Sequence, residues 1–405
     1  MKTAVVLSGG GAKGAYQIGV WKALRKLGIN YDIVTGTSVG ALNGVLMVQQ
    51  DFHSAINLWT NIDYNFVFDK EKVNLNQNIY LSYVKEFIKD GGMNVSKLED
   101  NIDSFLDKKR FFASNIDYGI VTYNLSKMKK EILTKNDLNP QNIKDYIIAS
   151  ATCYPAFKIK KINDEKYIDG GYYDTLPINL AIELGADRII AVDLKAPGIR
   201  QKIKYKNKEI ISIIPNNNIG SFLKFDKYVS RRNIKYGYND TLKAFGKFVG
   251  KKYTFYKIPY NFFVKSVQEK FNKNLNNYFN EHKTMKEQLK MILSKLILNY
   301  NKSQIIDVIE FTGGVLKIED TKIHFLNCYN YLLKKEFKKI PAIDEMIIKE
   351  KISKKDFDSL LGSRYIVKYI YQILKNKKKY MEIYSLVPIF KKEFLSAMYL
   401  ISIGC

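Results

Sequence analysis

The stretch Ile33-Val34-Thr35-Gly36-Thr37-Ser38-Val39-Gly40 joins a short β-branched run to an uncharged helical segment. Its last five residues fit the pattern G-x-S-x-G. A strand, a sharp turn and a helix in this order hold the serine in a strained conformation. The helix also points its N-terminal N–H groups at the serine, where negative charge develops during acyl transfer. The stretch therefore predicts a nucleophile elbow at Ser38, with a glycine-rich turn and an incidental serine as the alternative.

The first two hundred residues alternate short apolar strands with helical segments. Four apolar or β-branched runs have the length of buried strands: 3–7, 33–35, 116–122 and 189–192. Between the first two runs, apolar residues recur with the spacing of one helical face: Tyr16, Val20, Ala23, Leu24 and Leu27. Gly28 follows as a stop signal. This alternation predicts an α/β fold with a parallel-rich central sheet.

A second glycine-rich turn, Ser8-Gly9-Gly10-Gly11-Ala12-Lys13-Gly14, follows the first predicted strand and precedes the first helix. Successive glycines leave backbone N–H groups unshielded, so that they can converge on an anion. Lys13 adds a positive charge at the same place. The turn therefore predicts either an oxyanion hole or a phosphate cradle.

The same turn raises an alternative function, nucleotide binding. Gly9, Gly11 and Gly14 satisfy G-x-G-x-x-G, the pattern of dinucleotide-binding turns, and Asp32 lies about where a ribose-binding acid would be expected. Asp32 precedes its strand, however, whereas the dinucleotide acid lies at the carboxyl end of the strand. The position of Asp32 therefore counts against a dinucleotide site. Nucleotide binding through residues 9–14 remains the alternative to acyl chemistry, because the glycine pattern itself fits it.

The third candidate is Asp169, in Tyr167-Ile168-Asp169-Gly170-Gly171. Taken alone, a carboxylate before two glycines is typical of a plain Asx turn. Together with the other two turns it supplies the base that Ser38 would need. A Ser-His-Asp triad would need a histidine after the acid, and none occurs between Asp169 and His282. The pattern therefore favours a Ser-Asp dyad, with His53 as a surface residue and His324 in the second half of the chain.

These residues resemble the patatin-like phospholipases. Three blocks carry the resemblance, and they are residues 8–14, 36–40 and 169–171. The segment 149–157 is also similar to the Ala-Ser segment that precedes the family's catalytic aspartate. The resemblance covers roughly residues 1–245. It implies a three-layer α/β/α fold and hydrolysis of fatty-acyl esters of phospholipids or lysophospholipids, without a metal or a cofactor.

Carried over by position, the resemblance assigns a role to each candidate. Ser38 becomes the nucleophile and Asp169 the base, and Lys13 lies beside the oxyanion hole as a substrate- or anion-binding residue. The oxyanion hole falls to the backbone N–H groups of Gly9, Gly10 and Gly11. Acyl transfer to another alcohol is a close variant on the same fold.

One position departs from the family pattern. The third block often continues as D-G-G-x-x-x-N-x-P, and here Thr175 replaces the asparagine ahead of Pro177. This departure leaves the role of Asp169 unchanged, but it leaves open how the loop of Asp169 is held in place.

The positive charge is concentrated in the second half of the chain. Of the net charge of +25, residues 1–200 carry 25 Lys and Arg against 22 Asp and Glu, whereas residues 201–405 carry 40 against 18. Such an excess favours an anionic partner, either nucleic acid or a membrane surface. For a lipid hydrolase we expect an anionic membrane surface, bound through residues 250–405, and we expect no nucleic acid.

Beyond residue 200 the alternation of strands and helices disappears. Two apolar helical faces stand out, Met285, Leu289, Ile292, Leu293 and Leu296 in the first, and Ile366, Ile370, Ile373 and Leu374 in the second. With 46% hydrophobic and 26% charged residues, most of the chain is not disordered. We expect residues 1–245 to form the patatin-like domain and residues 246–405 a mostly helical, basic domain.

No targeting or membrane-spanning segment is visible. The apolar run at residues 3–7 is too short for the core of a signal peptide, and the longest uncharged stretch, residues 33–50, contains Gly36, Gly40 and Gly44. The three cysteines, Cys153, Cys328 and Cys405, lie too far apart for a zinc site or a disulfide framework. We therefore expect a cytoplasmic protein without a metal, able to associate with a membrane peripherally.

Overall fold

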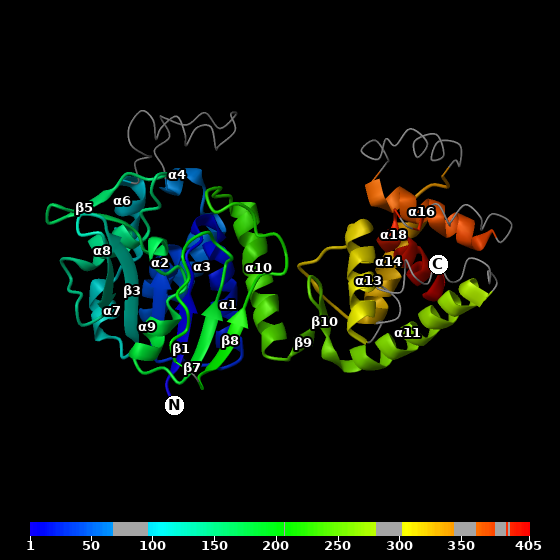
Figure 1. The fold of residues 1–405 in the computed structure, drawn as a ribbon, viewed down its shortest axis with the longest axis horizontal. Helices are drawn as coiled ribbons and strands as arrows, with labels where there is room; N and C mark the ends of the chain where they lie inside the picture. Colours follow the sequence, from blue (N-terminus) through cyan, green and yellow to red (C-terminus); the bar gives the residue numbers. More distant parts are fainter. Residues whose placement is uncertain (68–95, 206, 281–301, 344–361, 377–385, 388) are drawn as a thin grey trace. The chain divides into compact units, whose positions relative to one another are not determined.

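The computed structural model describes residues 1–67, 96–205, 207–280, 302–343, 362–376, 386–387 and 389–405. The chain divides into two compact units, Met1–Phe245 and Gly246–Cys405. The first unit is built around one large sheet, and the second is mostly helical (Figure 1).

The described part of the first unit contains an eight-stranded sheet in the order β5-β6-β3-β2-β1-β7-β8, with β4 paired to β3. Its strands are β1 (Thr3–Leu7), β2 (Ile33–Thr37), β3 (Asp117–Asn124), β4 (Lys129–Thr134), β5 (Lys160–Ile162), β6 (Glu165–Asp169), β7 (Arg188–Val192) and β8 (Glu209–Ile213). The pairs from β3 through β2, β1 and β7 to β8 are parallel. The pairs of β4, β5 and β6 are antiparallel. The expected parallel-rich sheet is confirmed.

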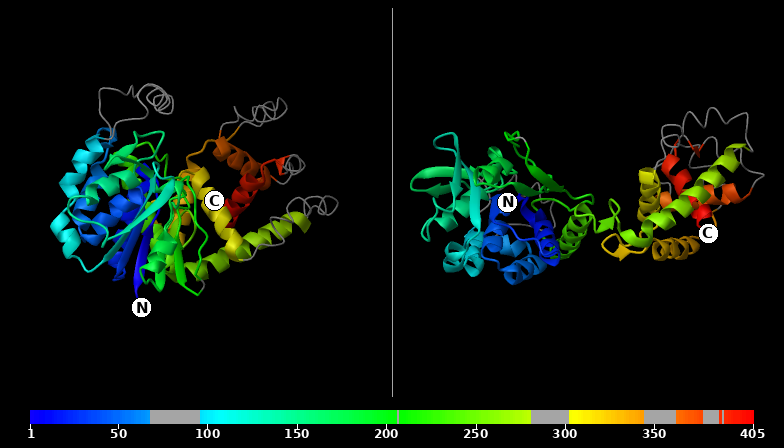
Figure 2. Two further views of the ribbon diagram at one scale, coloured as in Figure 1. Left: turned by 60° about the vertical axis from the view of Figure 1, so that its left-hand side comes forward. Right: turned by 90° about the horizontal axis from the view of Figure 1, so that it is seen from below.

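Helices cover both faces of this sheet. Side chains alternate along a strand, so Val5 and Leu7 of β1 pack in the same core as α1 (Ala15–Lys26) and α2 (Val39–Val48). Ala4 and Val6 point to the other face and pack with α9 (Ile178–Glu183). The result is the three-layer α/β/α arrangement expected from the sequence, and Figure 2 shows the first unit from two further sides.

The remaining helices of the first unit are short, except for one. They are α3 (Phe52–Asn61), α4 (Tyr64–Val67), α6 (Ser96–Phe105), α7 (Lys108–Ala113), α8 (Ile143–Ser150) and the longer α10 (Lys227–Ala244). Two 3-10 turns, η1 (Gly11–Gly14) and η3 (Gly170–Tyr172), lie in the glycine-rich blocks that the sequence pointed to.

The register of the sheet brings two of these blocks together. Ser38 follows Thr37, which is paired with Val121 of β3. Asp169 at the end of the antiparallel strand β6 is paired with Thr122, the next residue of β3. Ser38 and Asp169 therefore meet at the same edge of the sheet, although they are far apart in the sequence.

The second unit packs its helices around an apolar core of its own. Its helices are α11 (Lys257–Asn280), α13 (Lys302–Val315), α14 (Leu326–Lys338), α16 (Gly362–Lys375) and α18 (Lys391–Ser402), beside the short strands β9 (Phe248–Val249), β10 (Thr254–Tyr256) and β11 (Ile323–His324). The apolar face at Ile366 and Ile370 is buried in this core. The face at Met285–Leu296 lies outside the described residues. Among the helices that are described, none is both long and apolar enough to cross a membrane.

Candidate active site

Ser38 occupies the sharp turn that the sequence predicted between β2 and α2. Its φ of 58° and ψ of −125° place a non-glycine residue in a sparsely populated region, and such strain is typical of functional sites. The flanking glycines are required by close backbone contact. A Cβ atom on Gly40 would collide with the carbonyl oxygen of Leu7, and one on Gly36 would collide with that of Gly40. The pattern G-x-S-x-G therefore reflects packing on both sides of Ser38.

The segment at the end of α8 holds both halves of the Ser38–Asp169 pair. The Ser38 N–H donates to the Ser150 Oγ at 2.9 Å, and this hydroxyl donates to the carbonyl oxygen of Val121 at 2.7 Å. The Asp169 N–H donates to the carbonyl oxygen of Thr152 at 2.8 Å. The Ala-Ser segment noted in the sequence thus connects the turn of Ser38 to the end of β6.

Asp169 is a buried carboxyl group in contact with Ser38. Burial raises its pKa from 3.8 to about 6, against hydrogen bonds from the Ser38 side chain and from the Gly171 N–H, which lower it. The Gly171 N–H lies 2.7 Å from Asp169 Oδ1 and fixes the orientation of the carboxyl group. The structure therefore brings Ser38 and Asp169 together, with the carboxyl able to hold or release a proton near neutral pH.

The three glycine N–H groups expected for the oxyanion hole differ in their hydrogen bonding. The Gly9 N–H donates to the carbonyl oxygen of Thr175 at 3.0 Å, so the prediction that it belongs to the hole is corrected. Within the described chain, the N–H groups of Gly10 and Gly11 have no hydrogen-bond acceptor. A Cβ atom on Gly10 would come within 2.7 Å of Leu194, and Gly11 has a φ of +50°. Gly10 and Gly11 line the same cavity as Ser38.

Thr175, which replaces the asparagine of the family pattern, holds the loop of Asp169 in place through its backbone. It is buried, its carbonyl oxygen accepts from Gly9, and its N–H donates to the carbonyl oxygen of Ile199 at 2.8 Å. The loop of Asp169 is therefore tied to the glycine loop by backbone hydrogen bonds, which do not need an asparagine side chain.

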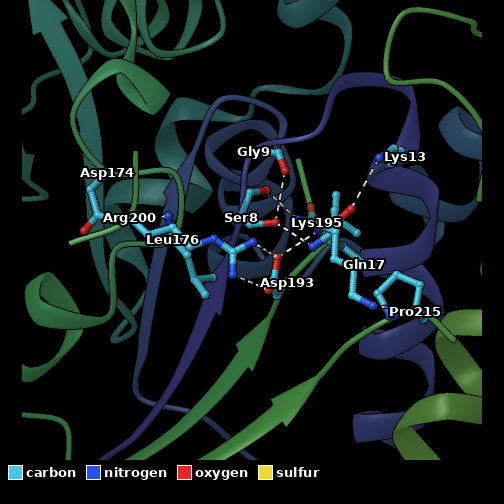
Figure 3. Close-up of polar contacts among 11 residues, drawn as sticks. Ser8, Gly9, Lys13, Gln17, Asp174, Leu176, Asp193, Lys195, Arg200 and Pro215 are labelled. Carbon is cyan, nitrogen blue, oxygen red and sulfur yellow. Dashed lines mark hydrogen bonds and ion pairs between the residues drawn. The ribbon is translucent and has the colours of Figure 1, made fainter. Parts of the chain in front are cut away.

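Lys13 follows the glycine loop and lies against the loop after β7. Its Nζ lies 3.5 Å from the carbonyl oxygen of Leu194 (Figure 3), and Lys13 is absent from the described lining of the cavity at Ser38. Burial lowers the pKa of Lys13, against the opposing effect of Asp193. The ammonium group of Lys13 packs against the loop after β7, and its role in binding the anion of a substrate stays a prediction.

An apolar cavity of about 480 Å³ opens at Ser38, within the range of small-molecule sites. Ser38, Asp169 and the glycines at 9–11 line one part of it. The walls include apolar side chains of α2, α3, α4 and α6: Leu42, Leu46, Leu58, Trp59, Phe66, Leu98 and Phe105. The polar side chain of Asn43 also lies in the wall, but it bonds Gly14, Gln17 and Trp59. The cavity suits a long apolar group bound next to the serine.

Of the other candidates in the first unit, neither Asp32 nor His53 lines this cavity. Asp32 accepts from the Thr3 N–H at 2.8 Å at the opposite end of β1 from the glycine loop, so it does not complete a dinucleotide site. His53 is exposed on α3, His324 is buried in the second unit, and His282 lies outside the described residues. The described residues contain no group of three or more His, Cys, Asp or Glu that could hold a metal ion.

Comparison with known proteins shows what the first unit is similar to. Residues 5–182, which lie within that unit, match the model of the patatin-like phospholipase family. The chain is 27% identical over 192 residues to the rat patatin-like phospholipase domain-containing protein 7, covering 47% of the chain and 13% of the relative. It is 30% identical over 201 residues to the lysophospholipase NTE1 of Chaetomium globosum, covering 47% of the chain and 12% of the relative.

The matched region is a small part of these long relatives, so the chain spans about an eighth of their length. Among solved structures, VipD from Legionella pneumophila aligns with 100% of this chain and 90% of its own, at 15% identity and a TM-score of 0.40. The type III effector protein ExoU aligns with 98% of this chain and 76% of its own, at 12% identity and a TM-score of 0.35.

Proposed function

We propose that this protein hydrolyses fatty-acyl esters of phospholipids or lysophospholipids through an acyl-enzyme on Ser38. The observation that carries the proposal is the contact of Ser38 with the buried carboxyl of Asp169 at one end of an apolar cavity. The match of residues 5–182 to the patatin-like phospholipase family supports it, as does the similarity to relatives named as lysophospholipases.

In the first half of the reaction, Ser38 Oγ attacks the ester carbonyl carbon while Asp169 accepts the hydroxyl proton. The ester C–O bond then breaks, and the proton passes from Asp169 to the leaving alcohol. In the second half, Asp169 takes a proton from a water molecule that attacks the acyl-enzyme, and the fatty acid leaves as Ser38 regains its proton. A pKa near 6 keeps Asp169 mostly ionised at neutral pH while it remains basic enough to accept a proton.

The tetrahedral intermediates place negative charge on the former carbonyl oxygen. We assign its stabilisation to the N–H groups of Gly10 and Gly11, because the Gly9 N–H is bound to Thr175. The N-terminus of α2 adds its positive dipole end at Ser38. Loss of one such donor typically costs about a hundredfold or more in rate, so displacement of the glycine loop should impair hydrolysis nearly as much as loss of the dyad.

For the second unit we propose a membrane role. Residues 246–405 carry 30 Lys and Arg against 15 Asp and Glu, and described lysines such as Lys335, Lys338 and Lys339 are exposed on or just after α14. Anionic lipid attracts each such residue by about 1 kcal/mol near the surface. Binding to anionic liposomes should weaken as salt rises, because salt screens exposed charges. Equal sedimentation with neutral and anionic liposomes would contradict this role.

The test of the proposed function is release of fatty acid from a panel of phospholipids, lysophospholipids and triglycerides, with glycerol added as an acceptor to detect acyl transfer. Ser38→Ala should abolish release from the lipids that the wild type cleaves. The matched control is Ser104→Ala, which removes an exposed hydroxyl from α6. Activity that survives in Ser38→Ala would exclude the mechanism, and ester made on glycerol in place of free acid would point to acyl transfer.

A further inference from the structure

A short loop after β7 touches both halves of the candidate active site. Residues 194–200 follow Asp193, and four of them, Ala196, Pro197, Gly198 and Ile199, line the cavity at Ser38. Nothing in the sequence patterns pointed to this loop. Its ends are joined by an ion pair between Asp193 and Arg200, which Figure 3 shows beside Ser8.

The ion pair has the geometry of a strong contact. Arg200 Nη1 lies 2.7 Å from Asp193 Oδ2, and Nη2 lies 2.7 Å from Oδ1, so the guanidinium binds the carboxylate through two parallel hydrogen bonds. The Lys195 N–H also donates to Asp193 Oδ1, at 2.8 Å. Asp193 is 5% exposed, whereas the Arg200 side chain is 46% exposed. The loop is therefore closed by a buried carboxylate, that of Asp193, and an arginine, Arg200, whose side chain is accessible to solvent.

One arm of the loop leads to the oxyanion hole. The Leu194 N–H donates to Ser8 Oγ at 2.9 Å, and this hydroxyl donates to the carbonyl oxygen of Gly9 at 3.0 Å. The Leu194 side chain packs directly against Gly10. The position of Leu194 therefore sets where the free N–H groups of Gly10 and Gly11 point.

The other arm leads to Asp169. The Ile199 N–H donates to the carbonyl oxygen of Gly171 at 2.9 Å, and the Ile199 carbonyl oxygen accepts from Thr175 at 2.8 Å. Gly171 in turn donates its N–H to the Asp169 carboxyl group. Movement of Ile199 would therefore shift the residues that orient Asp169.

We propose that Arg200 and Asp193 are positioning residues for acyl hydrolysis. By closing the loop at its base, they fix Leu194 against the oxyanion hole and Ile199 against the loop of Asp169 at the same time. Neither side chain touches the reacting atoms, so their loss should slow the chemical step and leave substrate binding in the apolar cavity nearly unchanged. The inference rests on the proposed function, because it assumes that Ser38 and Asp169 catalyse the hydrolysis.

An ion pair that only stabilised the fold would have the same geometry. Chemical rescue distinguishes this structural role from the proposed positioning role. Arg200→Ala should lower kcat on a short soluble ester by about a hundredfold, the scale expected when catalytic groups are misplaced by about 1 Å, while KM changes less than twofold. Added guanidinium or methylguanidinium at millimolar concentration can reach the exposed position of the missing side chain, and it should restore a large part of kcat. Arg200→Lys, which retains charge but cannot form two parallel bonds, should fall between.

Arg188→Ala is the matched control, because Arg188 forms an ion pair with Glu209 at the other end of β7. It should keep kcat near the wild-type value and show no rescue. All rates are expressed per folded active site, determined by titration with a fluorophosphonate. If Arg200→Ala does not fold, the kcat of Arg200→Lys and of Asp193→Asn decides the question.

A kcat of Arg200→Ala within twofold of the wild type would overturn the inference, as would an equal loss in Arg188→Ala or a loss that guanidinium does not reverse. The proposed function fails in a different way, because the wild type itself would then hydrolyse no acyl ester.

Discussion

Asp169→Asn should abolish hydrolysis and at the same time stabilise the first unit at alkaline pH. Burial raises the pKa of Asp169 from 3.8 to about 6, so the folded state disfavours the ionised carboxylate. That difference corresponds to about 3 kcal/mol at pH 8, where the group is ionised in both the folded and the unfolded chain. Asparagine removes the charge and can still accept the hydrogen bond from the Gly171 N–H. The variant should therefore gain up to about 3 kcal/mol in free energy of unfolding.

The sign of the effect fixes its pH dependence. Protonation of Asp169 stabilises the wild type fully below the pKa of the unfolded chain, about 3.9, and this stabilisation is lost as the pH rises through about 6. The advantage of Asp169→Asn should thus be largest at pH 8 and should disappear near pH 4. Urea denaturation followed by tryptophan fluorescence measures it, because both tryptophans, Trp21 and Trp59, belong to the first unit.

Asp137→Asn is the control of opposite sign. Hydrogen bonds from the Thr134 side chain and N–H lower the pKa of the exposed Asp137, so its ionised form stabilises the fold. This variant should be less stable than the wild type at pH 8 and should remain active. If Asp169→Asn were destabilised equally at pH 8 and pH 4, burial of the ionised carboxylate would not destabilise the folded state. The raised pKa of Asp169, on which the mechanism depends, would then be contradicted.

Three further predictions concern the same site. The kcat/KM of the wild type should fall below about pH 6, because protonated Asp169 cannot accept the Ser38 proton, and a flat profile from pH 5 to 8 would contradict this. Gly40→Ala should lower kcat by about a hundredfold, since its Cβ would displace the turn from Leu7, whereas Gly314→Ala, which has open space around it, should be silent in the same ester assay. His53→Ala and added chelator should each change the rate less than twofold, and a large loss on either treatment would require a triad or a metal-bound water.

The sequence predicted the parts of the site whose signals are local. The β-branched run before Gly36 and the uncharged helix after Val39 are consecutive, so a strained turn at Ser38 could be expected before any tertiary contact was known. The same holds for the strand and glycine loop at residues 3–14. Local pattern also assigned the parallel-rich sheet, because alternating strands and helices leave few other folds.

The parts that could not be predicted depend on residues distant in the chain. The Gly9 N–H donates to the carbonyl oxygen of Thr175, and the Lys13 Nζ lies 3.5 Å from the carbonyl oxygen of Leu194, and neither contact could be foreseen from the neighbouring residues in the sequence. The pairing of Asp169 with Thr122 depends on the antiparallel register of β6, which no turn motif encodes. Arg200 was missed because an arginine seven residues after an aspartate is not a distinctive pattern.

The most direct test of the account is the site at which a serine-directed fluorophosphonate reacts. The wild type should be labelled once, at Ser38, as located by peptide mass spectrometry, and a lysophospholipid should slow the labelling because it occupies the apolar cavity. Hydrolysis should fall in proportion to the labelled fraction and reach zero at one label per chain. Labelling at another serine, or hydrolysis that persists when Ser38 is fully labelled, would contradict the assignment of Ser38 as the nucleophile.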